Sequence, residues 1–557
     1  MQRFAPSASS VSRRALGAFC LSTLALTAHA ANFFWDADGE ASAGYGGDGI
    51  WNTTTANWNT AGDGTGSLQT WTNSPLDEAH FLRATTGAIN VSGTITAKSL
   101  VFLNSGSGLT EYTLTGGALD LRQVSFSHAI NSTGNNTLNS AVHLFGGLAA
   151  STSHRARLNN ASGTLTLGAI QDISGVTGTH TLVLESYGTA LNINGDITKS
   201  TDSAGIVLEI GTSGTSNSTT YTLGGNNTGL TGGAKLYRGT LRLTNSNALA
   251  GISGLNVENA GTGSADTAIV LVGSGVSINK SITFVANTGD TAATDVRRIG
   301  GDCTSGSAAY TSTVNVNVQK QASGVEFTAA AGGRVNFTGS IAGSGLITKV
   351  GDGVVAFTRP SNGTSHTGGV VVAAGTLLAN GINSTGSSAV TVNSGATLGG
   401  NGTVNGTVTL AAGGRLSPGD MAADNVASLA GTFNGGSSLT WNSDDSTAGM
   451  VFHLGIDQAS SDQIVVTGAF TKGSGSNFIF DFTGSTINPS ITYTLITFGS
   501  TDFSLGDFSA INGAGGVFGF AGNSLTFSAI PEPASFAALM GMGALALFGA
   551  SRRRCRA

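Results

Sequence analysis

The sequence has very little cysteine, proline and charge for its length. Of its 557 residues, three are cysteines and seven are prolines. Cys20 and Cys555 lie in the terminal segments, so Cys303 stands alone in the body and we expect neither an intrachain disulfide nor a cysteine-based zinc site there. Seven prolines, without a glycine period of three, exclude collagen. Charged residues make up 10% of the chain, well below the usual quarter or so.

Positive charge is concentrated at the two ends of the chain, and the body is acidic. Seven of the 25 basic residues, but one of the 31 acidic residues, lie in residues 1–30 or 531–557. Residues 31–530 therefore carry a net charge of −12. A body this acidic repels phosphate, so we expect no nucleic-acid partner.

Glycine is abundant, at 84 residues, and short apolar runs alternate with threonine or asparagine. Residues 164–167 read Thr-Leu-Thr-Leu, and residues 314–318 read Val-Asn-Val-Asn-Val. Alternation puts one face of a strand inward and the other outward, and glycine suits tight corners. Hydrophobic residues reach 40%, enough to fill a core, so we do not expect disorder. The composition predicts an all-β protein of stacked strands.

The N-terminus reads as a secretory signal peptide. Arg13 and Arg14 precede the apolar stretch 15–27, and Ala28 and Ala30 supply the small residues of a cleavage site. The apolar stretch is too short to span a bilayer stably. We therefore predict a signal peptide over residues 1–30 and export of the remaining chain.

The C-terminal segment 531–557 contains three parts in order. These are a box of Pro531, Glu532 and Pro533, an apolar run at 536–550, and a basic cluster of Arg552, Arg553 and Arg554. This order resembles the PEP-CTERM sorting signal. The resemblance implies processing by an exosortase and an association with exopolysaccharide. The positive-inside rule keeps the arginines in the cytoplasm and the body outside, and the short apolar run suits a transient anchor in the inner membrane. An ordinary C-terminal membrane anchor is the alternative.

The body contains internal repeats. The pattern Thr-Gly-Gly, five residues, Gly-Thr-Leu occurs at 231–241 and again at 367–377. Gly375, Gly395 and Gly414 then mark successive corners at a nearly constant spacing. A coil of about 20 residues with glycine corners predicts a right-handed parallel β-helix, or solenoid, with N- and C-terminal β caps.

Residues 345–353, read with the pattern at 367–377, resemble the autotransporter-associated β-strand repeat. The resemblance is best over 341–420. A sorting tail stands where an autotransporter has its translocator, so self-transport is not expected. The predicted organisation is a signal peptide at 1–30, an N-terminal β cap region at 31–125, a β-solenoid at 126–420, a C-terminal β region at 421–530 and the sorting tail at 531–557.

Tryptophan is concentrated near the start of the mature chain. Trp35, Trp51, Trp58 and Trp71 fall within the cap region. The open end of a solenoid exposes strand edges and needs covering, so we interpret these residues as a plug of the core. Stacking of Trp35 and Trp58 against a glycan is the alternative, because aromatic faces suit sugar rings.

No catalytic residue or metal ligand can be assigned from a motif. Residues 36–40 have the acidic spacing that begins a calcium loop but lack the rest, so Ca²⁺ stays open as a ligand and no other cofactor is expected. Asp77, Glu78 and His80 form the one compact acid/base cluster, which we assign to a solvated turn. Parallel β-helices also host enzymes whose carboxylates come from different coils and leave no local motif.

We therefore predict an exported structural or adhesin-like protein of the cell surface or extracellular matrix, and not an enzyme. A polysaccharide lyase or hydrolase on the β-helix, and a lectin-like glycan-binding module, are the alternatives. A groove with converging carboxylates would favour the enzyme, whereas a flank lined by threonine, serine and asparagine would favour passive contact.

The two terminal segments generate a prediction about processing. We expect mass spectrometry of the native protein to find a mature chain that starts near Ala31 and ends near Pro531. Replacing Pro531 and Pro533 should leave the protein in the inner membrane. An intact arginine-rich tail on protein recovered from the medium would contradict the sorting hypothesis.

Overall fold

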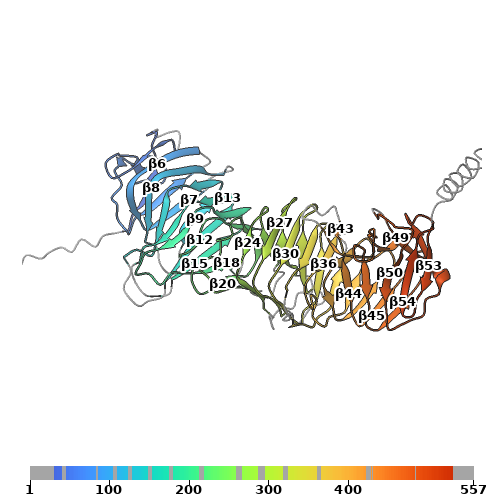
Figure 1. Cartoon of the computed structure of the whole chain (residues 1–557). Coiled ribbons are helices and arrows are strands. Elements are labelled where there is room, and N and C mark those ends of the chain that lie inside the picture. The colour runs from blue at the N-terminus through green and yellow to red at the C-terminus, as the bar shows by residue number, and fades with distance from the viewer. Residues whose placement is uncertain are drawn as a thin grey trace, which may run out of the picture.

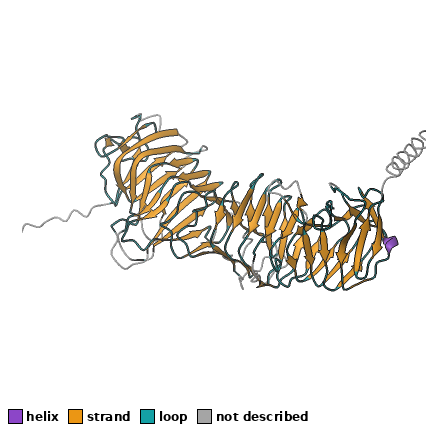
Figure 2. Ribbon diagram, in the orientation of Figure 1, coloured by secondary structure: helices purple, strands orange, loops and turns teal. Residues whose placement is uncertain are grey.

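The computed structural model is elongated, and nearly all of its regular secondary structure consists of strands that cross the long axis (Figures 1 and 2). The structure describes residues 30–530 except 40–45, 83–85, 104–108, 123–127, 148–153, 175–177, 179, 213–218, 259–265, 286–294, 318–323, 361–364, 422–427, 430 and 483–484. Within these residues the elements are strands β1 to β54 and one 3-10 helix, η1 (Leu505–Asp507). The predicted all-β fold is confirmed.

Sheet 1 forms one side of the molecule as far as residue 366. Its strands, in spatial order, are β34 (Ser365–His366), β31 (Ile341–Gly343), β28 (Val314–Val316), β25 (Ser281–Phe284), β22 (Gly254–Val257), β20 (Gly233–Leu236), β18 (Ile206–Ile210), β15 (His180–Ser186), β12 (His154–Ser162), β9 (His128–Thr133), β7 (Ser99–Leu103), β5 (Glu78–Leu82), β1 (Asn32–Trp35), β3 (Trp58–Asn59) and β4 (Leu68–Gln69). Neighbours pair in parallel except β1 with β3 and β3 with β4.

Sheet 2 forms a second side along the whole molecule, and its strands pair in parallel. In chain order they are β2 (Gly49–Trp51), β6 (Thr86–Ala97), β8 (Glu111–Leu121), β10 (Asn136–Leu138), β11 (Ala141–Leu144), β13 (Thr164–Leu167), β14 (Ile170–Asp172), β16 (Ala190–Ile193), β17 (Ile197–Lys199), β19 (Thr220–Leu223), β21 (Gly239–Leu243), β23 (Thr267–Leu271), β26 (Arg297–Gly301), β29 (Val325–Ala329), β32 (Ile347–Val350), β35 (Val370–Val372), β37 (Val390–Val392), β40 (Thr407–Leu410), β45 (Ser438–Trp441), β48 (Ala469–Lys472) and β51 (Ser500–Thr501). The long strand β8 pairs with β10 through its first half and with β11 through its second half.

Sheets 3 and 4 complete the coils. Sheet 3 contains β24 (Ser277–Ile278), β27 (Ser307–Tyr310), β30 (Arg334–Phe337), β33 (Val354–Phe357), β36 (Thr376–Ala379), β38 (Thr397–Gly400), β41 (Arg415–Pro418), β46 (Ala448–Val451), β49 (Phe478–Asp481) and β52 (Phe508–Ile511). Sheet 4 contains β39 (Thr403–Val404), β44 (Thr432–Gly435), β47 (Gln463–Val465), β50 (Thr492–Thr497), β54 (Ser524–Ser528) and β53 (Val517–Phe520), and a separate hairpin joins β42 (Asp420–Met421) to β43 (Ser428–Leu429).

The chain visits these sides in rotation. From β25 to β36 the order along the chain is sheet 1, sheet 2, sheet 3, and from β39 onwards sheet 4 takes the place of sheet 1. Each strand pairs in parallel with the strand one coil later, which is the topology of a three-sided parallel β-helix. The predicted solenoid is therefore confirmed.

Coil length varies along the chain. Val370 pairs with Val390 and Val390 with Val408, so these two coils are close to the predicted length. Val408, however, pairs with Leu439, which closes a much longer coil. The predicted coil of about 20 residues is right for these two coils and for others, such as those from Thr220 to Thr240 and from Arg334 to Val354. It is too short for coils such as the one from Val408 to Leu439, because longer corners separate the strands while the strand register is kept.

Parallel stacking extends beyond the predicted solenoid boundaries of 126 and 420. In the N-terminal region β1 already stacks on β5, and in the C-terminal region β49 stacks on β52. Apart from the β42–β43 hairpin, antiparallel ladders among the described strands are confined to β3 and β4 at one end and to β53 and β54 at the other. Most of 31–125 and of 421–530 therefore forms further coils, and the caps are short.

The core is a set of apolar ladders inside the coils. One ladder aligns residues of sheet 2 in register: Leu165, Leu191, Tyr221, Leu241, Ile269, Ile299 and Phe327. All are fully buried. Burying a side chain of this size contributes about 1.5–3 kcal/mol relative to exposure, so stacking one coil on the next supplies most of the stability.

Two corner glycines differ in their surroundings. Gly375 and Gly395 precede β36 and β38, and both have positive φ, +61° and +76°. A Cβ at Gly375 would lie 2.4 Å from the carbonyl oxygen of Gly351, whereas a Cβ at Gly395 would meet no atom within 4 Å.

We expect Gly375→Ala to lower the free energy of unfolding more than Gly395→Ala. Both changes impose the left-handed strain of about 1–2 kcal/mol, and the clash at Gly375 adds roughly 1–3 kcal/mol. Chemical denaturation of the purified protein measures both losses. Equal losses would show that the corner at Gly375 relaxes without cost.

Candidate functional site

The four tryptophans of the N-terminal region lie inside the molecule. Trp35 and Trp58 are 0% exposed and their ring centroids are 5.2 Å apart, while Trp51 and Trp71 pack against Trp58 at 4.8 and 4.7 Å. The indole N–H of Trp71 donates to the carbonyl oxygen of Thr96 at 2.9 Å. The rings plug the first coils, as the capping interpretation requires. Glycan stacking on Trp35 and Trp58 does not hold in this structure, because neither ring has a face open to a sugar.

The sorting residues and most of the signal peptide lie outside the described residues. These comprise Pro531, Glu532, Pro533, Arg552, Arg553 and Arg554, together with Ala28. Ala30 is the first described residue. Within the described part of the chain, no helix is long and apolar enough to cross a membrane. Sorting and cleavage at these residues therefore stay predictions.

The acidic cluster at 77–80 is part of the sheet, and the predicted solvated turn is wrong. Asp77 is 5% exposed, and its Oδ1 accepts a hydrogen bond from the backbone N–H of Ala31 at 3.0 Å. Glu78 and His80 lie on β5, where Glu78 accepts a hydrogen bond from Nζ of Lys98 at 2.7 Å. Since β1 stacks on β5 in parallel, the cluster fastens the start of the first strand.

The acidic residues of the calcium-like segment are partly buried. Asp36 is 2% exposed and accepts a hydrogen bond from Nδ2 of Asn59 at 3.0 Å. Burial raises the pKa of Asp36. Glu40 lies outside the described residues. Over the described ranges, no three His, Cys, Asp or Glu side chains come close enough together to hold a metal ion.

A buried group of serine, histidine and aspartate lies at the corners near β14, β15 and β17. Nδ1 of His180 lies 2.9 Å from Oδ2 of Asp172, and the hydroxyl of Ser203 donates to that same oxygen. All three residues are at most 3% exposed. The carboxylate lies between the hydroxyl and the imidazole, so His180 does not activate Ser203 as a nucleophile. The group joins coils and does not form a hydrolytic triad.

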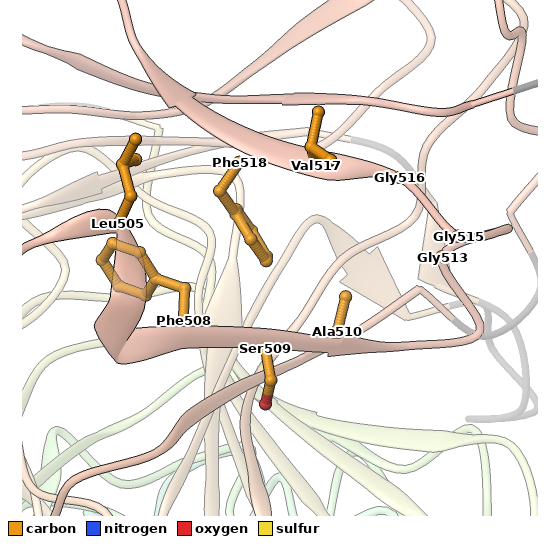
Figure 3. Close-up of a pocket in the computed structure, with 9 residues that line it drawn as sticks. All are labelled: Leu505, Phe508, Ser509, Ala510, Gly513, Gly515, Gly516, Val517 and Phe518. Carbon is orange, nitrogen blue, oxygen red and sulfur yellow. The ribbon is translucent and has the colours of Figure 1, made fainter.

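A cavity of about 290 Å³ lies at the C-terminal end, between β52 and β53 (Figure 3). The rings of Phe508 and Phe518 face it, and Leu505 and Val517 complete its apolar walls. Among its lining residues, Ser509 alone has a polar side chain, and its hydroxyl points away from the rings. The other polar groups of this cavity are therefore those of the backbone.

A wider cavity, of about 520 Å³, lies on the outer side of sheet 2 near its start. Asp48 and Glu111 line it with Thr86, Thr113 and Asn135. Both carboxylates are exposed, and neither has the apolar surroundings that keep a general acid protonated in glycoside hydrolysis. The cavity is a polar groove with two acidic groups at its rim.

A column of outward-facing residues continues from this groove along sheet 2. Asn135 connects the groove to the column, because its Oδ1 accepts the backbone N–H of Thr164 at 3.0 Å. Register pairing between successive strands defines the members, which we call the threonine face: Thr164, Ala190, Thr220, Thr240, Ala268, Arg298, Glu326, Thr348, Val371, Thr391, Thr409, Thr440 and Thr471. All are partly exposed, and most of them are threonine.

The threonine face repeats at the spacing of the coils. Parallel strands lie about 4.8 Å apart, so hydroxyl and methyl groups recur at that distance. At the C-terminal end of the column, Oγ1 of Thr440 and Oγ1 of Thr471 share a hydrogen bond at 3.0 Å. Charge interrupts the column in its middle, where Arg298 forms an ion pair with Glu326. From Thr348 onwards the column is uncharged.

The outer side of sheet 1 is different around β12 to β22, because it carries ion pairs there. Arg157 lies 3.1 Å from Glu185, Lys235 lies 3.3 Å from Glu258, and Arg155 pairs with Glu209. Charge therefore lies on the outer side of sheet 1 around β12 to β22, whereas threonine predominates in the column on sheet 2. Sequence reasoning missed the threonine face because its members are widely and unequally spaced along the chain, and only the register of the coils aligns them.

Buried ionisable groups also brace the corners. Lys349 points into the core ladder beside Phe327, and its Nζ donates to the carbonyl oxygens of Gly351 at 2.7 Å and Ala374 at 2.9 Å. Burial lowers the pKa of Lys349 to about 8. This lysine satisfies backbone carbonyls of two successive coils, and its role is structural.

Asp462 has the same role near the C-terminal end. It is 0% exposed, and its carboxylate accepts hydrogen bonds from the backbone N–H of Gly431 at 2.9 Å and of His453 at 2.7 Å. Burial raises its pKa to about 7 against the effect of these two donors.

Comparison with known proteins gives one partial similarity. Over 93 residues the chain is 39% identical to the adhesin BmaC autotransporter of Brucella suis biovar 1 (strain 1330). The matched stretch covers 16% of this chain and 3% of that protein. No family model matches the chain. The similarity thus relates a short part of the chain to a small part of an autotransporter adhesin.

The raised pKa of Asp462 predicts a pH-dependent stability. The ordinary value is 3.8, so the folded protein holds this proton up to about pH 7. The resulting stabilisation is complete below the ordinary pKa and disappears as the pH rises through 7. The quantity to compare is the difference in unfolding free energy between the wild type and the Asp462→Asn variant. We expect this difference to fall by up to about 4 kcal/mol as the pH rises from 4 to 7.

Chemical denaturation at several pH values in this window checks the expectation. Asp444→Asn is the control. Backbone N–H groups lower the pKa of this exposed carboxylate, so its contribution is constant between pH 4 and 7. A difference between wild type and Asp462→Asn that rises with pH would contradict the burial argument.

Proposed function

We propose that the protein is exported and acts at the cell surface or in the extracellular matrix as a structural, adhesin-like protein associated with exopolysaccharide. The observation that carries this proposal is the threonine face, an extended hydroxyl-lined flank on a continuous β-helix. A hydroxyl-lined flank favours passive contact over catalysis. The similarity of 93 residues to an autotransporter adhesin supports a location at the cell surface.

Export and sorting are part of the same proposal. The signal peptide at 1–30 directs the chain across the inner membrane. The tail at 531–557 holds it there transiently through its apolar run until an exosortase removes the tail. Retention of the tail as an ordinary anchor is the alternative, and the β-helix faces outward in both cases.

Glycan degradation is the second candidate, since Asp48 and Glu111 line one groove on a fold that hosts polysaccharide-degrading enzymes. Both carboxylates are exposed to solvent and neither lies in an apolar pocket, which weighs against this candidate. The lectin-like alternative at Trp35 and Trp58 has lost its basis, because both rings are buried.

We expect the purified protein to bind polysaccharide from the matrix of the producing cells without degrading it. Binding is measured by co-sedimentation, and degradation by the appearance of new reducing or unsaturated ends. Asp48→Asn with Glu111→Gln should leave binding unchanged. Turnover that survives repurification and disappears in this double variant would establish the enzyme instead.

A further inference from the structure

The matrix-binding role leaves open where a polysaccharide lies on the molecule. We infer that the threonine face, from Thr348 to Thr471, binds a neutral linear polysaccharide that runs along the β-helix axis. This inference rests on the proposed function and adds the binding surface, the orientation of the polymer and its charge.

The first argument is the match of one repeating structure to another. The column from Thr348 to Thr471 has one outward side chain per coil, and successive coils lie about 4.8 Å apart. A linear polymer that lies along the axis meets a threonine at each of these coils except the one that presents Val371. One neutral hydrogen bond contributes only about 0.5–1.5 kcal/mol net, so useful affinity comes from many coils engaged by one chain.

The second argument is chemical. A threonine side chain offers a hydroxyl, which donates and accepts, beside a methyl group. The hydroxyl suits the hydroxyls of a sugar, and the methyl packs against its C–H groups. No residue of the column between Thr348 and Thr471 is charged. Because the body carries a net charge of −12, a polyanion is repelled and a neutral polymer is favoured.

The third argument is rigidity. Threonine is branched at Cβ, which restricts χ1. The residues on either side of Thr391 and Thr409 in their strands, such as Val390 and Val408, are buried in the core, so the backbone beneath the hydroxyls is held in place. Binding therefore orders few protein groups, which lowers its entropic cost.

Sheet 3 fits a neutral polymer less well in this region, and sheet 1 ends before Thr391 and carries ion pairs around β12 to β22. On sheet 3, Thr376 and Thr397 form one register pair, but the next position in that column is Arg415. This short pair provides a control, since it lies in the coil of Thr391 and in the coil before it and also faces outward.

The experiment compares Thr391→Val with Thr409→Val, made together, against the control pair Thr376→Val with Thr397→Val. Valine keeps the branched Cβ and the strand preference and removes the hydroxyl. The probe is neutral polysaccharide from the matrix of the producing cells, fractionated by length, and the readout is affinity for the secreted protein. We expect the first pair to bind roughly tenfold more weakly, the control pair to bind like wild type, and wild-type affinity to grow with fragment length.

Several outcomes would overturn the inference. If the variant with Thr391→Val and Thr409→Val binds as tightly as the wild type, the polymer lies elsewhere on the molecule. The proposed function would then still stand. Equal loss in both pairs, or a wild-type affinity independent of fragment length, would also reject the threonine face. Absence of wild-type binding to every fraction would reject the proposed function as well. A variant with Thr391→Ser and Thr409→Ser keeps the hydroxyls and should bind like the wild type. If its affinity falls as much as that of the valine variant, the hydroxyls do not make the contact.

Discussion

The in-register hydrogen bonding of each coil to the next governs the whole structure. A parallel strand aligns residue with residue, so whatever one coil presents inward or outward is set beside its counterpart in the next coil. Leu165, Leu191 and Tyr221 stack for this reason, and so do Thr391, Thr409 and Thr440 on the opposite side of the same sheet. Core and surface are thus two consequences of one register.

Keeping this register costs free energy at the corners of the coils. The chain turns sharply, and its backbone groups lose their partners in the sheets. Gly375 supplies a positive φ, Lys349 satisfies carbonyl oxygens and Asp462 satisfies N–H groups. Lys349 and Asp462, whose pKa values are shifted by burial, therefore both brace corners of the coils.

Local sequence patterns predicted much of the fold because the β-helix is built from local patterns. Alternation such as that at 164–167 predicted strands, and glycine spacing predicted a stacked coil. Prediction failed where tertiary pairing decides. Asp77 lies beside a strand because β1 stacks on β5, and Trp35 is buried because the first coil needs a plug. The threonine face is invisible to local patterns, since corners of unequal length separate its members.

The long coil near residue 430 has a mechanical consequence. Hydrogen bonds between coils point along the axis, so tension between the two ends loads successive interfaces in series, and the weakest one yields first. Within the described residues, β41 and β46 pair in register only through Leu416 and Met450, whereas β38 and β41 share four such pairs. At the same joint, β40 and β45 share four register pairs, so under tension the sheet 3 side opens before the sheet 2 side.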